Sequence, residues 1–142
     1  MSFCTAINCI DGRVQIPVIR YLQKRFAVDH VDVISEPGPN RILAEESDRS
    51  AVESIVRRIG VSVKHHRSAG IAVVGHHDCA GNPSSEAKQN RHTTAAVLRV
   101  RSRFPYIPVV GLWVNDSWEV TELNDDSANS SMQATPNGSP DR

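Results

Sequence analysis

The chain has 142 residues, with 16 acidic and 16 basic side chains, and carries no formal net charge when its histidines are neutral. This length is typical of a single domain that buries its own core. The balanced charge excludes a global field that would attract nucleic acid or an anionic membrane. We therefore expect the partner to be a small uncharged molecule or another copy of the chain.

The cysteine content and the N-terminal segment predict a reducing compartment. Three cysteines are an odd and sparse set, which is a poor disulfide framework. Residues 1–8 lack the positive segment and long apolar stretch of a secretion signal, and no apolar run is long enough to span a bilayer. We predict a soluble cytoplasmic protein without a membrane partner.

The first strand and helix are predicted near the start of the chain. Phe3–Cys9 is uncharged and partly β-branched, which suits a central parallel strand buried on both faces. Gly12 allows the backbone to turn sharply. Ile19, Leu22 and Phe26 then recur at helical spacing and predict a helix.

The next segment predicts a strand, a loop and a long helix. Residues 31–34 read as the second strand, and 36–40 follow as an irregular loop, because they contain two prolines and a glycine. We expect this loop to form one wall of the site. Ser50 and Glu53 have the spacing of a capping box. The helix that they begin has an apolar face made of Val52, Ile55, Val56, Ile59 and Val63.

The second half of the chain continues the alternation of strand and helix. Residues 71–74 and 107–114 predict apolar strands, and 86–104 have helical spacing between them. Residues 118–123 alternate in polarity and should fold back as a hairpin strand. This order indicates an α/β fold with a mostly parallel sheet flanked by helices on both faces.

Composition changes abruptly near the end of the chain. Residues 124–142 are rich in Ser, Asn, Asp, Pro and Gly and contain almost nothing apolar, so burial cannot offset the entropy of ordering them. We expect one α/β domain over 1–123 and a disordered tail over 124–142.

Two short motifs offer metal-binding chemistry. Residues 9–13 and 75–81 each follow a strand-like run, which is where α/β proteins place functional groups. Zinc favours thiolate and imidazole ligands, and catalytic zinc commonly uses three protein ligands and leaves a position for water. Cys9, His76 and Cys79 form such a set if their strands are neighbours, and we predict that they bind Zn²⁺.

Asp11 and Arg13 are expected to act beside this metal. Residues two apart in an extended segment point the same way, and a guanidinium can hold a carboxylate bidentately and keep it ionised. Zinc lowers the pKa of its bound water toward neutrality. Asp11 could accept the proton of that water, or it could move onto the zinc as a fourth ligand, and these two states exclude each other.

The two motifs together resemble those of the beta-class carbonic anhydrases. The pattern C-x-D-x-R occupies residues 9–13 and G-H-x-x-C occupies 75–79, and the likeness extends over 3–123. The resemblance implies a beta-carbonic-anhydrase-like fold and reversible hydration of carbon dioxide to bicarbonate by a zinc-bound hydroxide. It also implies a homodimer or higher homo-oligomer. The implied zinc ligands are Cys9, His76 and Cys79, with Asp11 and Arg13 as a catalytic dyad.

Other interpretations of the same residues stay open. A hydrolase of carbonyl sulfide or carbon disulfide would use the same zinc chemistry. A non-catalytic zinc protein would keep its site closed by Asp11. Without a metal, the cysteines and the histidine would form a buried thiol pair and a core imidazole, and Asp11 with Arg13 would only satisfy a turn.

Several residues near the motifs are assigned to structure. Cys4 lies inside the first strand and is expected in the core. His77 and Asp78 are interpreted as loop residues that can at most support the site by a hydrogen bond. Trp113 and Trp118 are expected to pack in the hairpin or at an oligomer contact.

Overall fold

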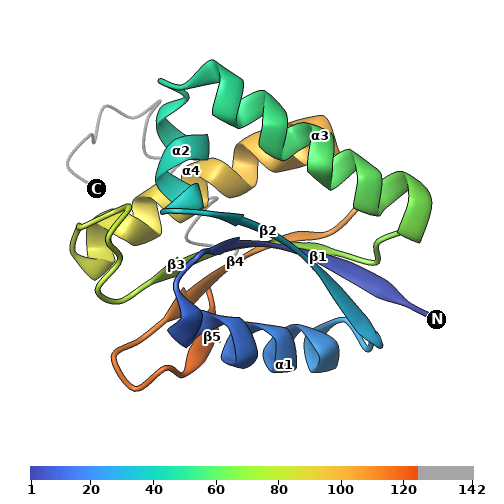
Figure 1. Cartoon of the computed structure of the whole chain (residues 1–142), viewed down its shortest axis with the longest axis horizontal. Helices are drawn as coiled ribbons and strands as arrows, with labels where there is room; N and C mark the ends of the chain where they lie inside the picture. The colour runs from blue at the N-terminus through green and yellow to red at the C-terminus, as the bar shows by residue number, and fades with distance from the viewer. Residues whose placement is uncertain (125–142) are drawn as a thin grey trace.

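The computed structural model describes residues 1–124, which form a five-stranded sheet with helices on both faces (Figure 1). The strands lie in the order β2-β1-β3-β4-β5. The first four are parallel, and β5 runs antiparallel to β4 as the predicted hairpin. Their bounds are Phe3–Cys9 for β1, His30–Glu36 for β2, Ile71–His76 for β3, Val109–Val114 for β4 and Val120–Glu122 for β5. The predicted α/β class is confirmed.

The helices form two layers around this sheet. A 3-10 turn at Gly12–Val14 leads into α1, Gln15–Arg25, which covers one face. The other face is covered by α2, Pro39–Glu45, together with α3, Arg49–His66, and α4, Glu86–Arg103 (Figure 1). Within residues 1–124, no helix combines the length and apolarity needed to cross a bilayer. The tail predicted over 124–142 lies outside the described residues, apart from its first residue.

Strand β1 contributes to both cores because its side chains alternate between the two faces. Cys4 and Ala6 pack into the cluster under α1, and Ile7 packs into the cluster under α3 and α4. Cys4 is fully buried, as expected. Val18 and Leu22 form the buried stripe of α1, and Val14, four residues before Val18, continues it into the 3-10 turn. Ile19 and Phe26 are only partly buried, so the predicted helix is present but its inward face is rotated.

Two local predictions were wrong. The segment 36–40 is not wholly irregular, because Pro39 begins helix α2. Proline is compatible with a first helical position, where its missing N–H would have no intrahelical partner. Helix α3 is capped by Asp48, whose Oδ1 accepts from the Ala51 amide at 3.0 Å. Asp48 is therefore the N-cap residue, and Ser50, two residues later, lies inside the helix.

The pairing of the strands brings the two motifs to one edge of the sheet. β1 pairs with β3 only at residues 5–7 and 71–73, while β3 continues to His76 alongside β4. β1 continues to Cys9 alongside β2. The carboxyl ends of β1 and β3 are therefore adjacent in the sheet but not hydrogen-bonded to each other by strand pairing.

Candidate metal centre

Three buried donor residues converge at the carboxyl ends of β1 and β3. Cys9 ends β1, His76 ends β3, and Cys79 follows in the next turn. One ligand atom from each lies within 4.8 Å of the others, and the two sulfurs are 3.8 Å apart. The side chains are almost inaccessible to solvent. This Cys-His-Cys group can bind a metal ion.

The His76 ring is held in one orientation, in which Nε2 can act as a metal ligand. Its Nδ1 lies 2.8 Å from the carbonyl oxygen of His77, so Nδ1–H donates to that carbonyl. Nε2 is then the unprotonated nitrogen, and it is buried without a hydrogen-bond partner among residues 1–124. Buried polar atoms are almost always paired. A backbone carbonyl on one nitrogen and a metal on the other is the usual arrangement of a ligating histidine, so the residues fit a metal.

The two thiols share one hydrogen bond and therefore titrate together. Hydrogen bonding with Cys79 lowers the pKa of Cys9, and the same contact together with burial raises the pKa of Cys79. Backbone groups of Gly38 and Asp11 also stabilise the Cys9 thiolate. Because metals bind the thiolate form, this environment prepares the site for a cation.

Arg13 holds Asp11 beside the metal-binding group. Nη2 and Nε of Arg13 donate to the two carboxylate oxygens of Asp11 at 2.7 and 3.0 Å, and the Arg13 amide donates to Oδ1 at 2.9 Å. These bonds lower the pKa of Asp11 to about 2. The carboxylate is therefore ionised at neutral pH. The predicted pairing of Asp11 with Arg13 is present in the structure.

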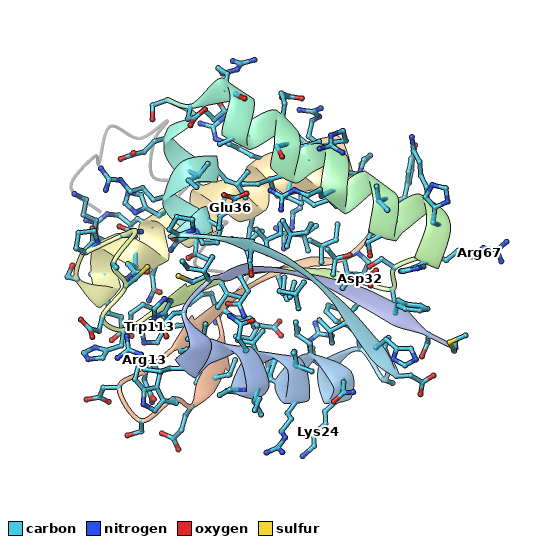
Figure 2. The ribbon with its side chains drawn as sticks, in the orientation of Figure 1. Arg13, Lys24, Asp32, Glu36, Arg67 and Trp113 are labelled. Carbon is cyan, nitrogen blue, oxygen red and sulfur yellow. The ribbon has the colours of Figure 1, made fainter. Side chains whose placement is uncertain are left out.

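Two further residues fix the guanidinium of Arg13. Asp78 accepts from Nη1 through Oδ2 at 3.2 Å and from Nη2 through its backbone carbonyl at 3.1 Å. The indole of Trp118 lies under the guanidinium, 4.5 Å from ring centroid to Cζ. Arg13 and Trp113 lie at the same end of the molecule, far from Arg67 (Figure 2). Asp78 was expected at most to support the site by a hydrogen bond and Trp118 to pack in the hairpin, because nothing in the spacing of residues 78 and 118 points to residue 13.

A buried polar network also went unnoticed in the sequence. It lies behind His76 and consists of Asn40, Asn82, Gln89 and Thr93, all at most 1% exposed. Gln89 and Thr93 occupy the inward face of α4 beside Ala96 and Val97, and polar residues on an apolar helical stripe were the available signal.

The loop after β2 contacts the loop after β3 at Pro37, Gly38 and Gly81, and the wall predicted from residues 36–40 stays a prediction. A side chain at Gly81 would place its Cβ 2.3 Å from the carbonyl carbon of Pro37, so only glycine fits this close approach.

A cavity of about 530 Å³ opens beside Cys79. It is lined by His77, Asp78, Cys79, Pro83, Ser84, Ser85, Glu86, Trp113, Asn115 and Asp116. A small molecule can therefore approach the metal-binding group from this side.

The mostly parallel sheet and the Cys-His-Cys group at the carboxyl ends of its strands define an α/β protein with a candidate metal centre. The family described as "Putative carbonic anhydrase" matches residues 1–124, and the chain belongs to this family. No curated protein matches the chain in sequence.

Solved structures support the same fold. The beta-carbonic anhydrase isoform I of Trichomonas vaginalis superposes with a TM-score of 0.54 at 18% identity, covering 84% of this chain and 80% of its own. The beta-carbonic anhydrase CcaA gives 0.57 at 13% identity, with 88% and 81% covered. One of two tetrameric beta-carbonic anhydrases of Sordaria macrospora gives 0.50 at 14% identity, with 85% and 80% covered. At these identities the likeness concerns the fold.

Proposed function

We propose that this chain is a zinc-dependent carbonic anhydrase that catalyses the reversible hydration of carbon dioxide to bicarbonate. Cys9, His76 and Cys79 would hold the zinc. The observation that carries the proposal is the buried Nε2 of His76, which has no hydrogen-bond partner among residues 1–124. One ligand atom each of His76, Cys9 and Cys79 lies within 4.8 Å of the others. Two thiolates and one imidazole are a typical donor set of catalytic zinc.

Zinc bound there would lower the pKa of its water ligand and supply a nucleophile near neutral pH. Asp11 would orient the proton of that ligand. Because Arg13 keeps the pKa of Asp11 at about 2, the carboxylate stays a hydrogen-bond acceptor at neutral pH and retains a proton poorly. Its role is therefore to accept a hydrogen bond in a fixed direction and to pass any proton onward to solvent or buffer.

Arg13 would act through Asp11 by holding its direction. Asp11 alone could rotate, but five hydrogen bonds from Arg13 to Asp11 and Asp78 fix the side chains on both sides of the guanidinium. The alternative in which Asp11 becomes the fourth zinc ligand requires these contacts to break. The geometry thus favours a catalytic site over a permanently closed one.

The test is stopped-flow hydration of carbon dioxide by the zinc-loaded protein, from neutral to mildly alkaline pH. We expect a rate that rises with pH and falls to the uncatalysed rate when zinc is removed by a chelator. An uncatalysed rate at full zinc occupancy would reject the proposed reaction. The same preparation would then be assayed with carbonyl sulfide and carbon disulfide.

We also propose that the chain forms a homo-oligomer, since beta-carbonic anhydrases of the same fold include tetramers. Ile10 and Ile16 are 61% and 60% exposed and could lie in such a contact. Light scattering after size-exclusion chromatography measures the mass, and a monomer at micromolar concentration would reject this part of the proposal. The expected cytoplasmic location stays a prediction.

A further inference from the structure

Strand β3 loses one of its neighbours before it reaches His76. Pairing with β1 ends at Val73, whereas pairing with β4 continues to the end of the strand. The amide of His77 donates to the Val114 carbonyl of β4 at 2.9 Å. Because successive residues of a strand direct their backbone groups to opposite sides, the N–H and C=O of His76 face away from β4. In the described part of the chain, no strand pairs with this side of β3 beyond Val73.

The side-chain amide of Gln89 makes the two hydrogen bonds that a neighbouring strand would otherwise make with His76. Its Oε1 accepts from the His76 amide at 3.2 Å, and its Nε2 donates to the His76 carbonyl at 2.7 Å. A single buried carboxamide thus satisfies both backbone groups of the residue that carries the imidazole. Unsatisfied, these two groups would be costly, because His76 is fully buried.

The Gln89 amide is itself fixed by partners on two other segments. Asn40 Nδ2 donates to Gln89 Oε1 at 3.2 Å, and Gln89 Nε2 donates to the Asn82 carbonyl at 3.1 Å. The backbone N–H of Asn82 in turn donates to the backbone carbonyl of Cys79 at 3.3 Å. The same side chain therefore connects the backbone of His76 with the turn that carries Cys79.

Because residue 75 is a glycine, the polar network of Asn40, Gln89 and Thr93 can lie close to strand β3. A Cβ on Gly75 would lie 2.8 Å from Asn40 Nδ2, 3.0 Å from Thr93 Oγ1 and 3.1 Å from Gln89 Oε1. The polar groups occupy the space that a side chain would need. The glycine before His76 is thus required by this network.

We propose that Gln89 is a positioning residue, which sets the backbone of His76 and the Cys79 turn so that their side chains converge on a metal. The role deepens the proposed function and rests on the proposed metal site. Partners of ligating residues typically contribute a factor of about 10 to 100 to metal affinity.

The first test is zinc affinity measured against a competing chelator. Gln89→Leu removes all four hydrogen bonds at similar volume, and we expect its zinc affinity to fall about tenfold or more. The control is Thr93→Val, which removes a buried hydroxyl one turn along α4 that accepts from Asn40 Nδ2 but makes no bond to His76. This control should keep its affinity within about twofold, even where its thermal stability falls.

The second test needs no metal. Hydrogen exchange of the His76 amide in the zinc-free protein should accelerate in Gln89→Leu and stay slow in Thr93→Val. Should Gln89→Leu not fold, Gln89→Met carries both tests, since its unbranched side chain of similar length also lacks the acceptor and both donors. The inference would be overturned by a Gln89 variant that keeps both the zinc affinity of the wild type and a slowly exchanging His76 amide. It would also be overturned if Thr93→Val lost as much zinc affinity and amide protection as the Gln89 variant. A wild-type protein that binds no zinc would reject the proposed function, while His76 exchange would still decide the role of Gln89.

Discussion

Arg13 and Asp11 are joined by a fork of hydrogen bonds in which Nη2 and Nε of the guanidinium each meet a different carboxylate oxygen, at 2.7 and 3.0 Å. Both residues lie at the start of the first loop, two positions apart. Asp78 and Trp118 hold the other side of the guanidinium. This one contact therefore links the two motifs and the β4–β5 hairpin.

Asp11→Ala should keep zinc and lose turnover. The change removes the carboxylate that orients the reacting proton, while the three donor residues remain. We expect the rate of carbon dioxide hydration to fall by about 100-fold, the usual cost of a misplaced reacting group, with unchanged zinc content by elemental analysis. A variant as active as the wild type would show that Asp11 has no part in the reaction.

Cys79→Ala should lose zinc. Removal of one of three protein ligands should reduce the content from about one zinc ion per chain to near zero after dialysis. Cys4→Ala is the matched control, because Cys4 is an equally buried thiol on β1 that does not belong to the cluster of ligand atoms. A Cys79→Ala protein that retains zinc and activity would contradict the assignment of the site.

The acid titration of Asp11 should report its contact with Arg13. In the zinc-free protein, carbon-13 NMR should place the pKa of Asp11 near 2, below its ordinary value of 3.8, and Arg13→Gln should raise it toward that value. A pKa lowered by folding means that the ionised form is stabilised. This contribution to stability is therefore present above about pH 4 and is lost as the pH falls toward 2. An unchanged pKa in Arg13→Gln would contradict this explanation.

Gly81→Ala and Gly60→Ala should change stability in opposite directions. The Cβ at position 81 would collide with the backbone of Pro37 and Gly38, and we expect a loss of about 1–3 kcal/mol in the free energy of unfolding. At position 60, inside α3, a Cβ meets nothing within 4 Å. Alanine there should stabilise by up to about 1 kcal/mol, through its helix propensity. Urea unfolding measures the free energy of unfolding of both variants. Equal changes in Gly81→Ala and Gly60→Ala would reject the close contact between the loops after β2 and β3.

The alternation of strands and helices could be predicted from local patterns. The convergence of the two motifs followed only if their strands were neighbours, and the pairing of β1 with β3 shows that they are. Phe3–Cys9 and 86–104 carry apolar periodicities that identify their type locally, and the carboxyl ends of neighbouring parallel strands meet at one edge. The exact helix boundaries were harder to predict, because neighbouring residues can suit the same position. Asp48 and Ser50 both suit a helix cap, and Pro39 is compatible with a loop or a first helical turn.

By itself, the sequence determined the fold class and the three donor residues, because periodicity and motif spacing are properties of short segments. Only the tertiary structure decided what surrounds them. Asp78 and Trp118 meet Arg13 across 65 and 105 positions of the chain, and Gln89 reaches His76 of strand β3 from helix α4. Many polar residues could have made these contacts. Which of them do so depends on the placement of whole elements, fixed by apolar packing that no single motif encodes.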